Sequence, residues 1–397
     1  MKKEVKIYFV ILALTALGLA LSHDLFSNYF KDAYNVTTLQ RGSIELPREF
    51  PGVLCFLLVA MLSFISDLKI AFIAQILAFA GVFVLGFVTP SFLWMLFFLF
   101  INSMGMHLFL PLQDSIALSL VDKNRVGKRM GQFKGTMTAF QMIGALIAFV
   151  GFKSGVFSFT GKIKHIFIIS GFIFLVVAVL FLVLDRMINH KGIHHVKTRF
   201  VVRKEYSLYY VLVVMFGVQK QMMMVYAPWV LIELLHKKAD TISMLYMAGS
   251  FAGIFFIPAL GRWVDRFGVR KLLFADAISF IGVYFAYGAL VMGFTGGFFA
   301  MAGLPVLAAY LLFIVDRMST QMAIIRVVYL KQIALTEKDI TPTISLGISV
   351  DHVVSISCAV IAGWVWTQFG AHYLFFGVGA LSFVNLWVAF RVKESRK

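Results

Sequence analysis

Charged side chains inside long apolar stretches are the features of this 397-residue sequence most able to do chemistry. Lys220 lies near the middle of one such stretch, next to Gln219, and Tyr226 and Trp229 follow one to two helical turns later on a comparable face. A charge near the centre of a bilayer costs about 2.5–3.5 kcal/mol on insertion scales, so it needs a watery cavity or a partner. We predict that these four residues line a polar cavity. The alternative is that Lys220 pairs with an acidic residue for structure.

Two other apolar stretches carry adjacent ionisable residues. Asp316 and Arg317 are consecutive, and consecutive residues of a helix point about 100° apart, so they cannot neutralise each other along one face. Both are candidates for orienting the charge of a substrate. Asp351 precedes His352, and a histidine beside an acid in a low dielectric can titrate near neutral pH. These two are candidates for proton coupling, with a packing salt bridge as the alternative for Asp351.

Polar residues near the start of the chain form a second group. Asp24 is a candidate for proton coupling, and His107, near the middle of its stretch, is a candidate for the cavity or for proton coupling. Asp24 could also form a vestibule with Glu45, Arg48 and Glu49. Because Glu45 and Arg48 are three residues apart, a local pair on one helix is the alternative.

Asp114 and Arg326 are expected at similar depths in different stretches and carry opposite charges. That combination suggests a gate pair between helices. Equally, each residue could make a local interaction at the end of its own helix.

No arrangement typical of an enzyme is present. The sequence lacks a phosphate-binding loop, a nucleophile elbow and an HExxH metal motif. Its two cysteines, Cys55 and Cys358, lie in apolar runs without neighbouring ligands at zinc spacing. We therefore expect no catalytic residues, no metal site and no cofactor.

Composition indicates a membrane protein. Hydrophobic residues make up 60% of the chain and charged residues 14%, which leaves too little polar surface for a soluble protein of this length. The net charge of +17 would suggest nucleic acid in a soluble protein. Here the Lys and Arg residues cluster at the ends of apolar stretches on one side, as in cytoplasmic loops, so we expect a lipid bilayer and no nucleic-acid partner.

The apolar stretches predict an all-α integral membrane protein with twelve transmembrane helices, because each is near the ~20 residues that cross ~30 Å of hydrocarbon. A polar, basic stretch separates two sets of six, so we predict an N-terminal six-helix bundle over residues 1–184, a cytoplasmic linker over 185–206 and a C-terminal six-helix bundle over 207–397. The predicted helices are 7–29, 43–65, 70–88, 92–119, 132–152 and 166–184, then 208–231, 241–260, 272–294, 304–328, 341–366 and 373–390.

A dense cluster of glycine and charge separates the eighth and ninth of these stretches. Residues 261–271 read G-R-x-x-D-R-x-G-x-R-K, with Gly261 and Gly268 suited to a tight reversal at the membrane surface. Asp265, Arg266 and Arg270 supply the charges. The plain interpretation is a turn held on the cytoplasmic side by its positive charge.

The same spacing closely resembles the cytoplasmic-loop motif of the major facilitator superfamily, found between helices 2 and 3 and again between helices 8 and 9. The resemblance implies two pseudo-symmetric six-helix bundles and a secondary transporter, with Asp265 and Arg266 in a charge relay that latches one conformation. In the first half, Asp67 stands at the matching place, but the following G-x-R-K is missing. A symmetric latch is therefore in doubt.

We expect a secondary active transporter that moves a small organic solute by alternating access, with an anionic or zwitterionic metabolite favoured and with protons as a coupling partner. A multidrug or lipid exporter of the same fold is the alternative within this class. A non-transporting membrane sensor or scaffold is the alternative of another class. We expect a monomer that spans the cell or inner membrane many times, with both termini in the cytoplasm.

Overall fold

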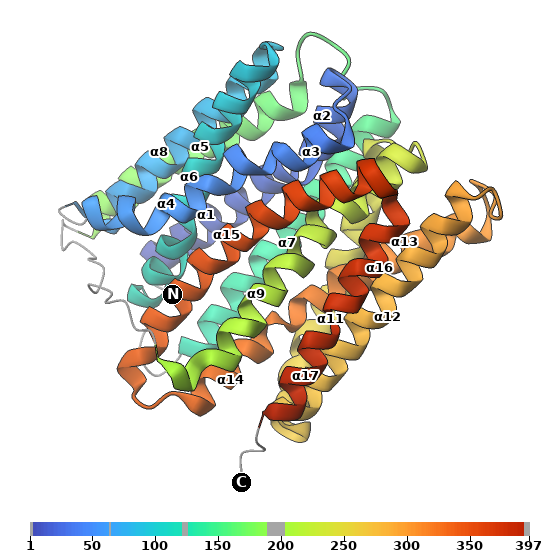
Figure 1. Cartoon of the computed structure of the whole chain (residues 1–397). Coiled ribbons are helices and arrows are strands. Elements are labelled where there is room, and N and C mark those ends of the chain that lie inside the picture. The colour runs from blue at the N-terminus through green and yellow to red at the C-terminus, as the bar shows by residue number, and fades with distance from the viewer. Residues whose placement is uncertain (1–2, 63–64, 121–125, 189–202, 393–397) are drawn as a thin grey trace. The chain divides into compact units, whose positions relative to one another are not determined.

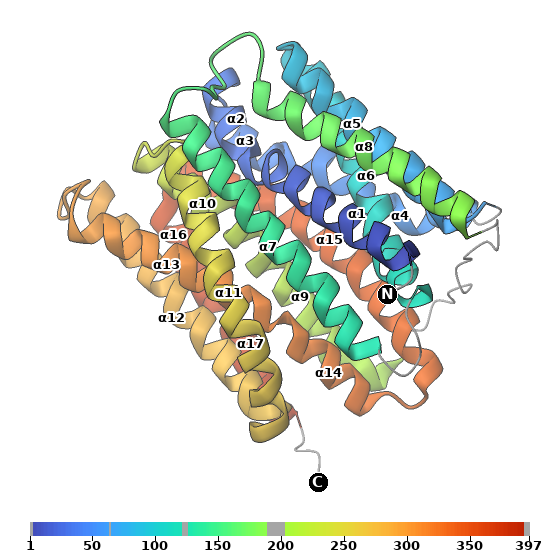
Figure 2. The same cartoon turned by 180° about the vertical axis from the view of Figure 1, so that it is seen from behind.

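The computed structural model describes residues 3–62, 65–120, 126–188 and 203–392 (Figures 1 and 2). Within these ranges the chain forms helices joined by turns and contains no strand. The all-α prediction is therefore confirmed for the described part of the chain. The predicted linker, 185–206, falls mostly on residues outside the described ranges, while its first residues belong to a helix.

The helical segments follow the predicted order. The first half contains α1 (Lys3–Ala20), the 3-10 turn η1 (His23–Leu25), α2 (Phe26–Tyr34), α3 (Thr38–Ser43), α4 (Glu45–Met61), α5 (Asp67–Phe87), α6 (Phe92–Ser119), α7 (Val126–Lys153) and α8 (His165–Met187). The second half contains η3 (Lys204–Tyr206), α9 (Ser207–Gln221), the π-helix η4 (Met222–Tyr226), α10 (Ala227–Trp229), the π-helix η5 (Val230–Leu234), α11 (Ala239–Phe267), α12 (Val269–Thr295), α13 (Leu304–Thr320), η6 (Gln321–Ala323), α14 (Ile324–Ile333), α15 (Glu337–Phe369), α16 (Ala371–Leu381) and α17 (Phe383–Arg391).

Ten helical segments of the described chain are long and apolar enough to cross a membrane. The two other predicted segments correspond to α4 and α13, which have 17 residues each. At 1.5 Å per residue such a helix is about 26 Å long, slightly less than the hydrocarbon thickness. The α13 segment continues through η6 into α14, which supplies the missing length.

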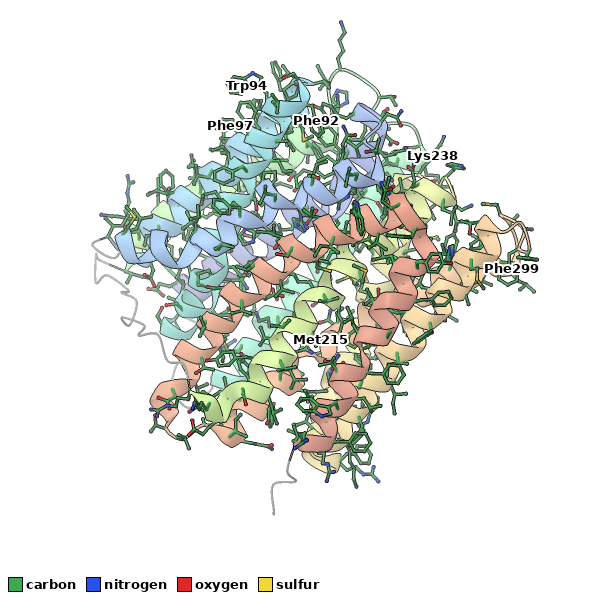
Figure 3. All side chains as sticks on the ribbon, in the orientation of Figure 1. Phe92, Trp94, Phe97, Met215, Lys238 and Phe299 are labelled. Atoms are coloured by element: carbon green, nitrogen blue, oxygen red, sulfur yellow. The ribbon has the colours of Figure 1, made fainter. Side chains whose placement is uncertain are left out.

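Large apolar side chains project from the helices where a lipid-facing surface is expected. In α6, Leu93 is 77% exposed and Trp94 is 59% exposed, and Figure 3 shows Phe92, Trp94 and Phe97 projecting outward together. Phe298, in the turn between α12 and α13, is 82% exposed. Exposed aromatic side chains at helix ends are typical of the boundary between hydrocarbon and water.

The chain divides into two compact units. The first contains Met1–Asn35, Pro47–Lys197 and Lys238–Ser250, and the second contains Val36–Leu46, Thr198–Lys237 and Phe251–Lys397. Each unit is thus built mainly from one half of the sequence. Two segments are exceptions: the short helix α3 is grouped with the second half, and Lys238–Ser250, which includes the start of α11, is grouped with the first.

In the first unit, α5 packs against both α6 and α8. Small residues allow this close contact: a β-carbon added to Gly105 in α6 would lie 2.2 Å from the carbonyl oxygen of Ala74 in α5. On the neighbouring turn, Asn102 donates from Nδ2 to the carbonyl of Ala78 at 2.8 Å. Glycine lets the two backbones approach where any side chain would separate them.

In the second unit, α12 packs against α13, α16 and α17, and α9 packs against α15. Aromatic rings fill the contact between α12 and α16: Tyr287 stacks on Phe375 with centroids 5.0 Å apart, and Phe376 lies against Gly288. The short α3 also packs on α15, and its first turn is closed by a capping box at Thr37.

Three predicted helices are interrupted. The first expected helix breaks at η1, the seventh contains two π-helical turns around Pro228, and the tenth changes to a 3-10 turn at Gln321. The apolar periodicity predicted single, continuous helices. It shows which residues are apolar, but it does not show whether the backbone hydrogen bonds of a given turn are those of an α-, 3-10 or π-helix. Irregular turns of this kind inside a helix are often found at functional sites.

The glycine-rich reversal is tighter than predicted. The motif does not begin with a turn, because Gly261 lies inside α11. The chain reverses at Gly268 alone, which has φ +80° and directly precedes α12. Only glycine adopts that backbone conformation without a steric penalty, whereas the helical Gly261 needs no such freedom.

We predict that Gly105→Ala destabilises the protein by about 1–3 kcal/mol, because the new methyl group would overlap the backbone of α5. The matched control is Gly131→Ala in α7, where an added β-carbon meets nothing within 4 Å. Thermal unfolding of both purified variants in detergent measures the difference. Equal melting temperatures would contradict the close contact between α5 and α6.

Candidate functional site

The second unit holds an ion pair between residues that are 131 positions apart in the chain. Lys220, one residue before the end of α9, donates from Nζ to Oδ2 of Asp351 in α15 at 2.6 Å. The two side chains remain 15% and 14% exposed. The second carboxylate oxygen, Asp351 Oδ1, has no hydrogen-bond partner among the described residues. This oxygen is buried and faces Gly217 of α9.

Close approach of α9 and α15 makes this ion pair possible. Gly217 lies three residues before Lys220 in α9, and a β-carbon there would be 3.0 Å from Asp351 Oδ1 and 3.0 Å from Cγ1 of Val354. A larger residue would hold the two helices apart at the level of the carboxylate. Sequence reasoning did not single out Gly217, although its position three residues before Lys220 can be read from the sequence.

A second buried carboxylate lies in the same unit. Asp316 in α13 is fully buried, and the Tyr284 hydroxyl from α12 lies 3.1 Å from its Oδ1 and 3.2 Å from the backbone carbonyl of Gln219. Asp316 Oδ2 and both polar side-chain atoms of Gln219 are buried without a hydrogen-bond partner among the described residues. Arg317, its neighbour in sequence, is half-buried. Substrate binding by Asp316, Arg317 and Gln219 stays a prediction.

Tyr226 and Trp229 are fully buried and tie the seventh helix to its neighbours. The Tyr226 hydroxyl donates to the carbonyl of Ala359 in α15, and Trp229 donates from Nε1 to Thr38 Oγ1 in α3 at 3.0 Å. Both polar groups thus have protein partners. Their predicted place in a cavity wall remains a prediction.

Asp114 and Arg326 each contact a charged side chain of their own unit. Arg326 Nη1 lies 3.6 Å from Oδ2 of Asp276, and the guanidinium stacks 4.1 Å from the ring centroid of Phe216. Asp114 accepts from Lys134 at 3.2 Å in an exposed ion pair. The suggested pairing of Asp114 with Arg326 stays a prediction.

The residues of the 261–271 motif are partly described. The Arg266 guanidinium lies 5.2 Å from the ring centroid of Phe267, and the Arg270 guanidinium lies 5.9 Å from that of Phe274. The side chain of Asp265 lies outside the described part of the structure. The charge-relay role implied for Asp265 and Arg266 therefore stays a prediction.

Asp67, at the matching place in the first half, is buried. Its Oδ2 accepts a hydrogen bond from Ser115 in α6 at 3.0 Å, and the adjacent Ser66 donates to Asp185 in α8 at 3.3 Å. These contacts tie the start of α5 to the two helices on either side of it. An aspartate at this place thus holds one end of the first unit together.

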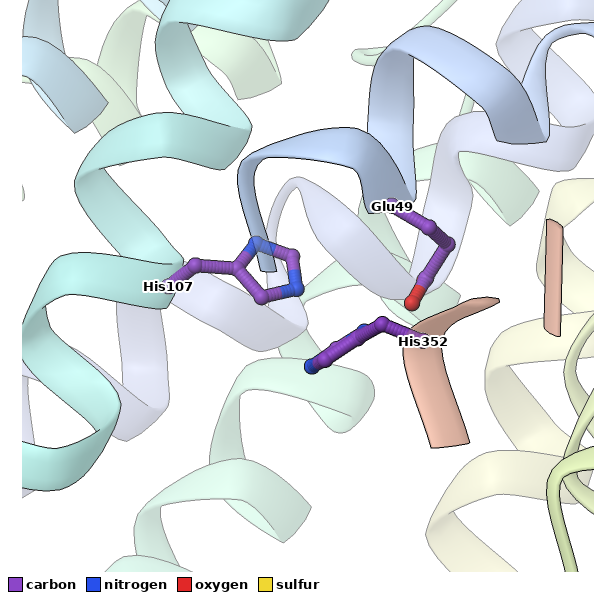
Figure 4. Close-up of side chains that lie close together, drawn as sticks. All are labelled: Glu49, His107 and His352. Atoms are coloured by element: carbon purple, nitrogen blue, oxygen red, sulfur yellow. The ribbon is translucent and has the colours of Figure 1, made fainter. Parts of the chain in front are cut away.

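Polar residues of η1, α4 and α6 meet in the first unit. Arg48 contacts Glu49 through Nη2 at 2.8 Å and His23 through Nη1 at 2.8 Å. Asp24 Oδ1 lies 3.9 Å from the His23 ring, and its Oδ2 is buried without a partner among the described residues. Figure 4 shows His107 of α6 facing Glu49. Asp24, Arg48 and Glu49 thus lie in one polar cluster, and the predicted vestibule stays a prediction.

Glu45 has a partner four residues earlier in the chain. It accepts from Arg41 at 2.6 Å, and both side chains are almost fully buried. The local pair of Glu45 with Arg48 stays a prediction.

Comparison of the sequence with models of known protein families assigns this chain to a family. Residues 49–331 match the model of the Major Facilitator Superfamily. The chain belongs to the major facilitator superfamily. This agrees with the resemblance of residues 261–271 to the motif of the superfamily, and the family and fold together are those of a secondary active transporter. Comparison with curated protein sequences finds no significant match.

Solved transporters share the fold of this superfamily member. The nucleoside transporter NupG has a TM-score of 0.73 at 12% identity, over 99% of this chain and 100% of its own. A POT family transporter in complex with 5-aminolevulinic acid has a TM-score of 0.71 at 11% identity, over 97% and 95%. The D-xylose–proton symporter has a TM-score of 0.67 at 15% identity, over 98% of each chain. At these identities the likeness establishes the fold.

In this superfamily member the segment just before the seventh helix is held by a second ion pair. Arg203 Nε lies 2.9 Å from Oδ2 of Asp339, near the start of α15, and the Tyr206 hydroxyl donates to the same oxygen at 2.8 Å. The hydrogen bond from Tyr206, helped by Thr336 and Arg203, lowers the pKa of the Asp339 carboxyl below its ordinary value. The contact connects the described end of the linker to α15.

We predict that this contact contributes stability with a defined pH dependence. Because the pKa of Asp339 is lowered in the folded state, its contribution is fully present above the unfolded pKa of about 3.9 and is lost as the pH falls through the folded pKa. Asp339→Asn should therefore lower the melting temperature at neutral pH, and the difference from wild type should shrink below about pH 4.

The control for this measurement is Asp114→Asn, whose partner pair is exposed and should contribute little at any pH. A deficit of Asp339→Asn that persisted unchanged at low pH would contradict the role of the ionised carboxylate.

Proposed function

We propose that this chain is a secondary active transporter that moves a small zwitterionic organic solute by alternating access, with protons as the coupling ion. The observation that carries this proposal is the Lys220–Asp351 ion pair inside the membrane-spanning part of the second unit. It offers one cation and one anion side by side, with one oxygen of the carboxylate lacking a partner among the described residues.

The charge balance favours a zwitterion over a simple anion. An anion bound to Lys220 would compete with Asp351 and leave a carboxylate unpaired in a low dielectric, which is strongly unfavourable. A zwitterion places its carboxylate at Lys220 and its ammonium at Asp351, so every charge keeps a partner throughout. The protein side chains then need only small shifts, because the ion pair is already formed.

One similar structure supports the solute class, and another supports the coupling ion. The structurally similar POT family transporter was solved with 5-aminolevulinic acid, a molecule with one amino and one carboxyl group. The similar D-xylose transporter is a proton symporter. Gln219 and Asp316 would supply hydrogen bonds to the polar part of the solute.

The proposed location follows from the distribution of basic residues along the chain. We propose that the protein resides in the cell or inner membrane as a monomer with both termini in the cytoplasm, because its basic residues concentrate at one set of helix ends.

We predict that purified protein is stabilised against heat by 5-aminolevulinic acid and not by levulinic acid, which lacks the amino group. A ligand present at 100 times its dissociation constant stabilises by about 2.7 kcal/mol, enough for a clear shift of the melting temperature. Pentylamine, which keeps an amino group and lacks the carboxylate, is the second control. Equal stabilisation by levulinic acid would contradict the role of Asp351 and favour a simple anion.

We predict that Lys220→Ala and Asp351→Asn each reduce uptake of labelled 5-aminolevulinic acid into proteoliposomes by about tenfold or more, since losing 1.4 kcal/mol of binding is tenfold. The double variant Lys220→Ala/Asp351→Ala should fold better than either single variant, because no charge is left unpaired, and should still fail to transport. Lys134→Ala, which breaks an exposed pair, is the matched control. Full uptake by the variants would contradict the proposal and favour a sensor or scaffold.

A further inference from the structure

The short helix α3 is held by the second unit, although the chain on both sides of it belongs to the first. Val36–Leu46 is grouped with the second unit, whereas the residues up to Asn35 and those that follow from Pro47 are grouped with the first. Within the second unit, α3 packs against α15. Alternating access requires the two halves of a transporter to move relative to each other. In that motion either α3 leaves α15, or the connections of α3 absorb the displacement.

The connections of α3 are short. Asn35, just before the segment, has φ +47°, the left-handed conformation in which α2 ends. At the other end, only Ile44 separates α3 from α4. A connection of one residue keeps α3 close to α4. When α4 moves with the first unit, α3 must therefore leave α15.

Glycines on both helices let α3 close tightly on the last third of α15. A β-carbon added to Gly42 of α3 would lie 2.5 Å from the carbonyl oxygen of Ala359. One added to Gly363 of α15 would lie 3.1 Å from the carbonyl oxygen of Thr38. Trp229 of the seventh helix donates from Nε1 to Thr38 Oγ1 at 3.0 Å. The backbones of α3 and α15 thus approach where a larger side chain would separate them.

This contact lies at one end of the two helices that carry the proposed zwitterion site. Tyr206 donates to Asp339 near the start of α15, and Tyr226 donates to the carbonyl of Ala359 nearer its end. The seventh helix therefore runs parallel to α15. At 1.5 Å per residue, the step along α15 from Asp351 to Ala359 is about 12 Å. α3 thus covers the helix pair beyond the ion pair, on the side away from Asp339.

The contact is polar enough to open reversibly. It includes backbone carbonyls and a hydrogen bond between an indole and a hydroxyl, and water can replace these partners when the contact opens. Arg41 and Glu45 form an ion pair at 2.6 Å inside the same segment, Val36–Leu46. Opening therefore leaves this ion pair intact.

We infer that α3 is a lid over the outer end of the zwitterion site, which closes on α15 at Gly363 and opens to admit solute from outside. With both termini in the cytoplasm, as proposed above, this end of α15 faces outward. Gly42 allows the lid to close, and the hydrogen bond from Trp229 to Thr38 holds it closed. The inference rests on the proposed transport function.

A disulfide between α3 and α15 tests whether the lid must open during transport. A β-carbon on Gly363 would lie 3.5 Å from the α-carbon of Leu39. That is within reach of a disulfide, whose α-carbons are usually about 4.4–6.8 Å apart. In a Cys55→Ser/Cys358→Ser background, oxidation of Leu39→Cys/Gly363→Cys should lower uptake of labelled 5-aminolevulinic acid at least about tenfold, because the open state is no longer populated. Reduction should restore uptake in the same molecules, and each single cysteine variant should keep its uptake through the oxidation.

A second measurement needs no solute. Ser355, between Asp351 and Ala359 on α15, is fully buried. In right-side-out vesicles of the same background, the rate at which a membrane-impermeant maleimide labels Ser355→Cys reports opening of the lid. Addition of Gly42→Ala should raise this rate at least about tenfold, because the methyl group would overlap the Ala359 carbonyl and keep the lid from closing. Gly131→Ala, where an added β-carbon meets nothing within 4 Å, is the matched control.

The outcomes are distinct. Uptake that survives oxidation although both thiols are consumed would overturn the lid, and so would failure of the two thiols to pair. Labelling unchanged by Gly42→Ala would overturn it too, as would an equal rise in inside-out vesicles, which reports general unfolding. Absence of uptake in the wild type would overturn the zwitterion transporter, and the labelling rates would still decide whether α3 is a lid.

Discussion

A charge inside a membrane must keep a partner, and this constraint explains most of the polar contacts in the protein. Lys220 pairs with Asp351, Arg326 pairs with Asp276, and Arg48 contacts Glu49. An unpaired charge at these depths would cost several kcal/mol, comparable to a large part of the stability of a folded domain. The partly exposed pair Lys220–Asp351 also meets this constraint.

Close helix contacts place these partners within reach of each other. Gly217 lets α9 approach α15 at the level of Asp351, and Gly105 lets α6 approach α5. Without a hydrophobic driving force between helices in lipid, packing and interhelical hydrogen bonds supply much of the association energy. A glycine next to a buried charge therefore determines function as well as packing, because it sets the distance across which the charge must reach.

Much of the architecture could be predicted from residue type and order alone. The apolar stretches predicted the helices, and α6 begins and ends at the predicted residues, 92 and 119. The turn signal at Gly268 and the motif around it pointed to the family. The breaks at η1, η4 and η6 could not be predicted, because apolar periodicity carries no information on local backbone hydrogen bonding.

The sequence by itself determined which residues are apolar, which few are charged among them, and that those few must find partners. Only the tertiary structure decided which partners they find: Lys220 with Asp351, Arg326 with Asp276, and Asp114 with Lys134. The physical reason is that helix length and depth follow from local composition, whereas partner choice depends on the rotation and spacing of helices that are far apart in the chain.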